Sequence, residues 1–179
     1  LVGIVDADQG LFGSDFRSAE RLAQSFVQVA GRAGRAQHPG EVCLQTMFPE
    51  HPLLRVLINE GYAQFATLAL EERRQAGWPP FACLALLRAE ASQRAQVFGF
   101  LQEAAALARE QAPAGLNVLG PASAPMERRA GRYRGQLLLQ SGSRRELQRL
   151  LPAWREAVAG IEVQRRVRWS LDVDPVDLF

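Results

Sequence analysis

Six segments with the periodicity of strands and helices follow one another after Phe81, and their order constrains the fold more than any other feature. Strand-like segments lie at 81–90, 117–119, 133–140 and 165–173, and helix-like segments lie at 93–111 and 143–158. The last strand alternates cleanly, with an apolar residue at every second position from Val167 to Val173. The order β-α-β-β-α-β packs most economically as one sheet with two helices on one face, a split-βαβ or ferredoxin-like arrangement.

The part of the chain before Phe81 has a different organisation. A strand-like run at 1–5, a helix at 17–30 and a strand at 41–47 form the tail of an α/β unit with parallel strands. Two helices at 51–60 and 62–75 come next, and Gly77-Trp78-Pro79-Pro80 ends the second. The chain is therefore predicted to be α/β and to divide into segments 1–48, 49–78 as a helical connector, and 79–179.

Positive charge is concentrated in the second part of the chain. The formal net charge is only +2, but 7 arginines face 9 carboxylates up to Pro80, and 14 face 10 from Phe81 onward. An anionic partner is therefore expected to bind the second part.

The segment Q-V-A-G-R-A-G-R, from Gln28 to Arg35, is the sharpest motif. Arg32 and Arg35 stand three residues apart at the end of a helix, where two guanidinium groups can pair with a terminal phosphate. Gly31 lets the backbone come close to that phosphate and leave the helix. The alternative is a plain helix terminus with solvated arginines. The leading Gln28 and the preceding strand, loop and helix favour a nucleotide-sensing helicase motif.

Six segments in order give the chain a resemblance to the primosomal protein N′ (PriA) family of helicases. They are D-A-D-Q-G-L-F-G-S-D-F-R-S-A-E-R (6–21), Q-V-A-G-R-A-G-R (28–35), Q-T-M-F-P-E-H-P-L-L (45–54), E-R-R-Q-A-G-W-P-P-F (72–81), L-G-P-A-S-A-P-M-E-R-R-A-G-R-Y-R (119–134) and W-S-L-D-V-D-P (169–175). The resemblance implies a parent that is an ATP-dependent 3′-to-5′ DNA helicase, which recognises stalled or repaired forks and initiates primosome assembly.

The resemblance also implies roles for particular residues. Segment 1–48 would end the second RecA-like lobe, and Arg32 and Arg35 would face ATP, bound with Mg by the first lobe. Gly31 would lie beside the phosphate, and Gln28 would couple that site to DNA. Residues 79–179 would be a DNA-binding domain whose fold resembles a small ribosomal-subunit protein.

Several expected parts of such a helicase are absent from the sequence. There is no G-x-x-x-x-G-K-[ST], no D-E-x-H and no cysteine cluster, since the chain has no lysine and two cysteines. We therefore expect no metal site here, zinc only in the parent, and no ATP hydrolysis or unwinding by this chain alone. Its start within a strand-like run suggests a piece of a longer chain. With no signal peptide or membrane span, a cytoplasmic, nucleoid-associated protein is expected.

A basic segment between two strands is the second candidate site. It holds Arg128, Arg129, Arg132, Tyr133 and Arg134. Arginines can fork to phosphates and the tyrosine can stack on an unpaired base, so branched or single-stranded DNA is the expected ligand. The alternative is a solvated hairpin whose charges only keep it soluble. The run 165–168 is a possible extension of the same surface.

Arg144 and Gln148 form a weaker candidate, one turn apart at the start of a helix. In the family that the chain resembles, the matching helix helps to bind the acidic C-terminal tail of single-stranded DNA-binding protein. The alternative is an ordinary exposed helix face. Other primosome proteins are further expected partners.

The remaining polar and aromatic residues are interpreted structurally. His51 is predicted to cap a helix, Trp169 to anchor packing, and Asp172 and Asp174 to end a strand rather than to bind a cation. The acidic residues at positions 6, 8 and 15 could instead face the nucleotide. A rival for the whole chain is a stand-alone, non-enzymatic module that binds nucleic acid or protein.

Overall fold

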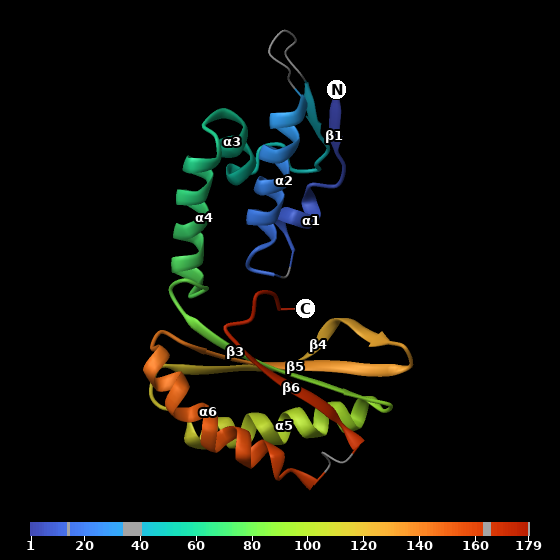
Figure 1. Cartoon of the computed structure of the whole chain (residues 1–179), viewed down its shortest axis with the longest axis vertical. Coiled ribbons are helices and arrows are strands. Elements are labelled where there is room, and N and C mark those ends of the chain that lie inside the picture. The colour runs from blue at the N-terminus through green and yellow to red at the C-terminus, as the bar shows by residue number, and fades with distance from the viewer. Residues whose placement is uncertain (14, 34–40, 163–165, 179) are drawn as a thin grey trace. The chain divides into compact units, whose positions relative to one another are not determined.

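The computed structural model describes residues 1–13, 15–33, 41–162 and 166–178, which form two compact units, Leu1–Ala76 and Gly77–Phe179 (Figure 1). The predicted connector at 49–78 is not a separate segment, because its two helices pack into the core of the first unit. Each unit has a core of its own.

In its described residues, the first unit contains a two-stranded parallel sheet and four helices. Its elements are β1 (Val2–Ile4), α1 (Asp8–Leu11), α2 (Ser18–Ala33), β2 (Val42–Leu44), α3 (Pro52–Asn59) and α4 (Tyr62–Ala76). The predicted parallel pairing is present, with Ile4 opposite Leu44. The helices bury one apolar stripe each, and Ala23 of α2, Leu57 of α3 and Phe65 of α4 meet in the core.

The segment after Asp6 contains the short helix α1. One local prediction for the first unit is wrong. Helix α2 runs through Gly31 to Ala33, instead of ending at Ala30. A single glycine costs a helix about 1 kcal/mol, which need not end it. Cys43 of β2 is exposed, although it lies between two apolar residues.

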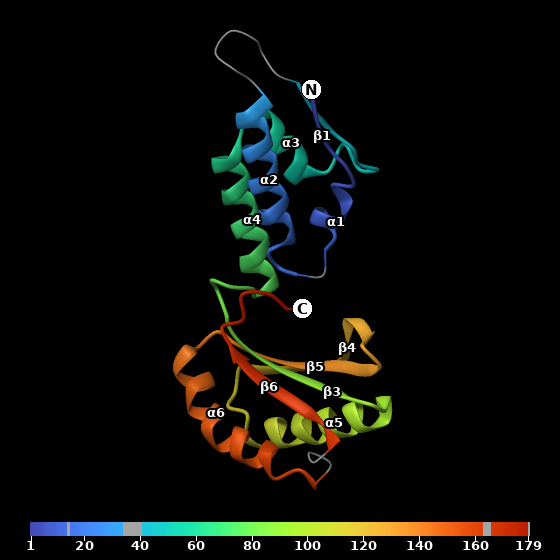
Figure 2. The same ribbon diagram turned by 45° about the vertical axis from the view of Figure 1, so that its right-hand side comes forward.

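The second unit is one antiparallel sheet covered by two helices. Its elements are β3 (Cys83–Ala91), α5 (Arg94–Gln111), β4 (Leu116–Arg129), β5 (Arg132–Ser141), α6 (Arg144–Ala159) and β6 (Arg168–Val173). The strand order is β4-β5-β3-β6, and every neighbouring pair is antiparallel. Both α5 and α6 lie on one face of this sheet in two views (Figures 1 and 2). The predicted β-α-β-β-α-β order and packing are therefore present.

The core of this unit lies between the sheet and its two helices. Leu87 of β3, Leu137 of β5, Phe100 of α5 and Trp154 of α6 are all fully buried there. Helix α6 begins as predicted, because the Ser143 hydroxyl accepts a hydrogen bond from the Glu146 amide at 3.3 Å.

Strand β4 is longer than its sequence predicts. We expected it to end at Gly120-Pro121, but it continues to Arg129, and only Ala130 and Gly131 separate it from β5. Proline has no backbone N–H to donate to a neighbouring strand. The edge strand β4 tolerates its two prolines because it pairs with a neighbour on one side only. Two register shifts, after Leu119 and after Ser123, absorb the residues that do not fit the ladder.

The residues after β6 cross part of the sheet face that the helices leave open. The Asp174 amide donates to the Leu84 carbonyl at 2.8 Å, and Arg88 Nη2 donates to the Asp177 carbonyl at 2.9 Å. The open face beyond Arg88, toward the β4–β5 turn, carries the groove described next.

Candidate functional site

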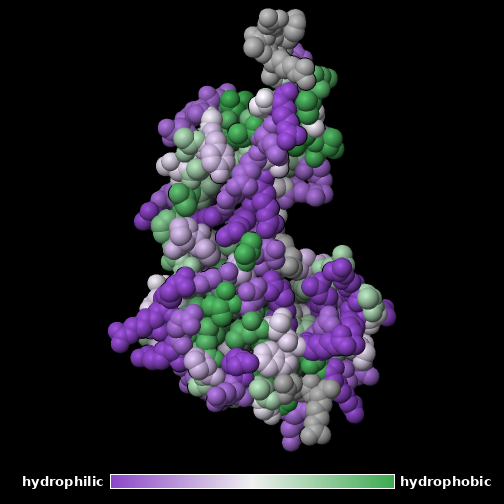
Figure 3. All heavy atoms as spheres, viewed as in Figure 1, coloured by the Kyte–Doolittle hydropathy of each residue, from purple (hydrophilic) through white to green (hydrophobic). Residues whose placement is uncertain are grey.

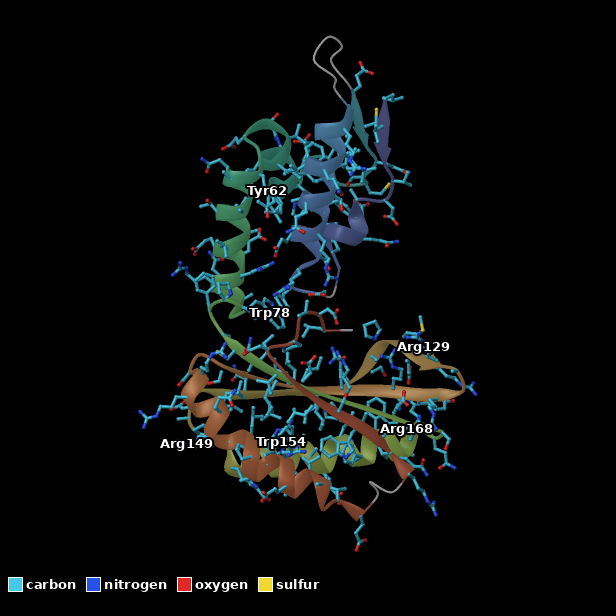
Figure 4. The ribbon with its side chains drawn as sticks, in the orientation of Figure 1. Tyr62, Trp78, Arg129, Arg149, Trp154 and Arg168 are labelled. Carbon is cyan, nitrogen blue, oxygen red and sulfur yellow. The ribbon has the colours of Figure 1, made fainter. Side chains whose placement is uncertain are left out.

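A groove of about 670 Å³ lies on the open face of the second unit. Its lining residues are Arg88, Ala89, Glu90, Ala124, Pro125, Met126, Arg129, Arg134, Gly135, Gln136, Arg168, Trp169 and Ser170. Arg129 and Arg168, from opposite edge strands, lie toward the end of the sheet where the hairpin turns (Figure 4). Hydrophilic side chains gather over this end of the unit (Figure 3).

Strand alternation brings the polar lining residues to one face. Arg88 and Glu90 lie two residues apart on β3, so both point away from the helices. The register sets Glu90 opposite Arg134 of β5 and opposite Arg168 of β6. Three charged side chains from three adjacent strands therefore meet in one row across the sheet.

The bulged part of β4 makes the wall of the groove. Between Ser123 and Arg128 the β4–β5 ladder is interrupted, and residues 124–126 line the groove instead. Arg94 Nε donates to Glu127 Oε1 at 2.6 Å, which ties this bulge to the start of α5. Met126 is 57% exposed, so the wall presents an apolar side chain.

The arginines of the groove differ in how far their charge is compensated. Arg88 is held by Asp172 at 3.0 Å and by Asp177 at 3.6 Å. Glu90 Oε1 lies 3.9 Å from Arg168, a long contact for an ion pair. No ion pair of Arg129 or Arg134 is found among the residues that the structure describes. Positive charge is therefore least compensated at these two residues.

The structure divides the predicted DNA-binding residues between two faces. Arg129 and Arg134 line the groove, and Arg132 lies beside it, 3.9 Å from Glu90. Tyr133 instead packs against the core on the helix side, and the Arg128 guanidinium lies 5.2 Å from the centre of its ring. These five residues therefore do not form one continuous surface.

The arginines of the basic run 165–168 also lie in different places. Arg168 lines the groove, Arg166 is exposed, and Arg165 lies outside the described residues. Sequence reasoning missed Arg88 and Glu90. Two charged residues at alternate positions of an otherwise apolar strand are a signal that could have found them.

The Gln28–Arg35 motif belongs to the first unit. Gln28 and Arg32 are four residues apart on α2 and both are exposed, so they share one helix face with Gly31 beside them. Arg35 lies outside the described residues. A lysine that would hold the phosphates of a nucleotide is absent from this chain.

The acidic residues near this motif have structural partners. Asp8 accepts hydrogen bonds from the Thr46 hydroxyl and from the Met47 amide. Asp15 is buried, accepts from the Arg17 amide at 2.9 Å and pairs with Arg21 at 3.3 Å. These bonds hold the loops around α1 and the start of α2.

Arg144 and Gln148 are exposed, one turn apart on α6. Arg144 Nη1 donates to Asp174 Oδ2 at 2.7 Å, and this hydrogen bond raises the pKa of the guanidinium above its usual value. Asp172 and Asp174 are thus paired with arginines, in line with the structural interpretation of the strand end. Among the described residues, no group of three or more His, Cys, Asp or Glu is arranged for a metal ion.

Two smaller predictions have clear outcomes. Trp169 is a packing residue, with its ring centre 6.3 Å from that of Phe100. His51 occupies the N-cap position of α3, but its side chain makes no capping hydrogen bond, so that prediction is wrong.

Comparison with known proteins assigns the family. A family model described as the primosomal protein N C-terminal domain matches residues 74–176. The chain belongs to this family. The match covers the second unit from the end of α4 to the residues that follow β6, and so includes every residue that lines the groove.

Curated relatives of this family align with both units. The replication restart protein PriA of Haemophilus influenzae is 47% identical over 178 residues, which are 99% of this chain and 24% of that protein. Its namesake from Synechocystis sp. is 38% identical over 99% of this chain and 21% of that protein. The Bacillus subtilis protein is 33% identical over 98% of this chain and 22% of that protein. The chain thus spans about a quarter of the length of these relatives.

Among the helices that the structure describes, none combines the length and the apolar character needed to cross a membrane.

Proposed function

We propose that this chain is the C-terminal part of a replication restart DNA helicase and that its second unit binds DNA. The family assignment and the relatives' names support the restart role. The observation that carries the DNA-binding role is the groove, in which Arg129, Arg134 and Arg168 lie close to one another on one face. Guanidinium groups fork to phosphates, so this surface suits a nucleic-acid backbone.

The DNA-binding proposal is tested by replacing Arg129 and Arg168 together with alanine. Binding of a labelled forked DNA, measured by fluorescence anisotropy at low salt, is expected to weaken about tenfold or more, because phosphate contacts dominate affinity. Arg149→Ala with Arg155→Ala is the matched control. It removes the same charge from exposed positions of α6, on the other side of the sheet. Unchanged binding in the first variant would refute the proposal.

The ATP-dependent, 3′-to-5′ unwinding activity is proposed for the intact protein. In it, Arg32 and Arg35 face ATP with Mg held by another part of the helicase, and Gln28 relays that contact to DNA. The alignment of both units with one stretch of each relative supports a single longer enzyme over a stand-alone module. Residues 1–48 would complete a RecA-like lobe. Zinc would be bound by the intact protein, outside this chain.

The ATP proposal is tested in the intact protein with Arg32→Ala. DNA-stimulated ATP hydrolysis is expected to fall by about a thousandfold or more, the range known for arginine fingers, while nucleotide binding persists. Arg55→Ala is a control, since Arg55 is exposed on α3 and forms an ion pair with the nearby Glu50. Full activity of Arg32→Ala would contradict the assignment.

Arg144 and Gln148 are proposed to bind the acidic C-terminal tail of single-stranded DNA-binding protein, and other primosome proteins are proposed as further partners. The exposure of Arg144 supports the first proposal, because a peptide carboxylate can reach this side chain and exchange with Asp174. Arg144→Ala is expected to abolish binding of the tail peptide, and Arg145→Ala, next to it on α6 and also exposed, is not. Equal binding by both variants would exclude Arg144 from the site.

A further inference from the structure

We infer that the groove on the open sheet face binds one unpaired nucleic-acid strand in preference to a duplex. The inference rests on the proposed DNA-binding function and adds the ligand class and the residues. In it, Arg129, Arg134 and Arg168 take backbone phosphates of the strand. Residues 124–126, which form the apolar wall, contact the face of a base. Glu90 places a negative charge on the sheet surface at the bottom of the groove.

The size of the groove favours a single strand over a duplex. Its volume of about 670 Å³ falls within the range of about 300–1,000 Å³ that is usual for pockets that take small molecules. A single strand is flexible and can place one or two nucleotides into such a hollow. A duplex is stiff over about 150 base pairs and keeps its bases inside, so it would touch only the rim.

The side chains that line the groove favour contacts with phosphate over stacking of bases. One common class of RNA-binding domain uses the open face of a four-stranded sheet, where aromatic residues on the central strands stack bases. The central strands here present Arg88 and Glu90 on β3, and Arg134 and Gln136 on β5. Among the described residues that line the groove, Met126 on the edge strand β4 is the large apolar side chain that is exposed. Binding is therefore led by phosphate contacts, with base contact at one side.

The charges at the two ends of the groove give it a direction. Arg88 is already paired with Asp172 and Asp177, so this end of the groove attracts phosphate only weakly. Arg129 and Arg134 carry uncompensated charge among the described residues, at the hairpin end. A strand is thus held most strongly beside the β4 bulge, where the apolar wall stands.

Glu90 is the residue that limits the affinity of the groove for a single strand. Its carboxylate lies 3.9 Å from both Arg132 and Arg168 and competes with phosphate for them. A carboxylate on the floor also repels a backbone that settles too deeply. Glu90→Gln keeps the shape and removes this charge, so single-strand binding is expected to tighten severalfold.

The decisive experiment compares single-strand and duplex binding by the full chain. The probes are a labelled oligo(dT) of about 12 nucleotides, within the site sizes known for single-strand binders, and a duplex of equal length. Arg129→Ala with Arg134→Ala is expected to weaken oligo(dT) binding at least about tenfold. The slope of log K against log salt should fall by roughly 1.4, at about 0.7 per lost phosphate contact. Duplex affinity is expected to change less than about twofold.

Two control variants distinguish a contact made in the groove from a general effect of removing positive charge. Arg149→Ala with Arg155→Ala removes equal charge outside the groove and should leave oligo(dT) binding within about twofold. Arg128→Ala changes the neighbour of Arg129 on the tyrosine side of the hairpin and should also have little effect. Circular dichroism of each variant confirms that it is folded.

The results separate the two proposals. Failure of the unsubstituted chain to bind any DNA refutes the proposed function itself. DNA binding that depends on Arg128 rather than Arg129, or that falls equally for duplex and single strand, overturns the groove assignment alone. Unchanged or weaker oligo(dT) binding by Glu90→Gln overturns the role given to Glu90.

Discussion

At the scale of single residues, Trp154 shows how one side chain joins the two helices of the second unit. It is fully buried among the core residues of the sheet, α5 and α6. Its indole Nε1 donates to the Ala104 carbonyl of α5 at 2.9 Å. The side chain thus contributes both apolar area and a buried hydrogen bond between the two helices.

Trp154→Phe is expected to lower the free energy of unfolding of the second unit by about 1–3 kcal/mol. The change removes a buried hydrogen bond and leaves a small void, while most of the apolar contact is kept. Urea unfolding followed by far-ultraviolet circular dichroism measures the effect. A loss below about 0.5 kcal/mol would mean that the bond to Ala104 contributes little net stability.

At the scale of elements, the β4–β5 hairpin decides where the candidate DNA contacts lie. Arg129 and Arg132 pair across a turn of two residues, Ala130 and Gly131, which both have positive φ, at 49° and 76°. Turns of this type favour Asn-Gly, because alanine in the left-handed region is strained. The turn fixes the register, and the register directs Arg128 and Arg129 to opposite faces.

Ala130→Asn is expected to stabilise the second unit by about 1 kcal/mol, since it relieves this strain at an exposed position. Differential scanning calorimetry should show a melting temperature raised by roughly 4–8 °C for a unit of this size. Ala130→Val provides a control of opposite sign, because a branched side chain tolerates positive φ poorly. A lower melting temperature for the asparagine variant would contradict the turn geometry.

At the scale of the whole molecule, the two units have separate cores. Every member of the larger core cluster lies between Ala85 and Val167. The clusters of the first unit are built from residues of that unit alone. Stability in each unit therefore comes from contacts within it, which is the property of an independently folding domain.

A fragment of residues 77–179 is expected to fold alone and to keep the affinity of the full chain for oligo(dT). Its core and its groove are complete within that range. Amide hydrogen exchange measured by NMR should show protected β3 and β5 amides in the fragment, as in the full chain. An unprotected fragment would show that the second unit depends on the first for its stability.

Much of the element order could be read from local patterns. Apolar periodicity located the four strands and two helices of the second unit, and Ser143 marked the start of α6. Predictions failed where a local signal was weaker than its context. Gly31 does not end α2, and Gly120-Pro121 does not end β4, because packing along a helix and pairing at a sheet edge outweigh single residues.

The sequence by itself determined the α/β class, the element order of the second unit and the concentration of positive charge after Phe81. These depend on hydrophobic periodicity and composition, which are local properties. Only the tertiary structure decided which arginines act together. Strand register brings Arg134 and Arg168 beside Glu90 and turns Arg128 away onto Tyr133. A shift of one residue would reverse every face, so this choice depends on pairing between distant segments.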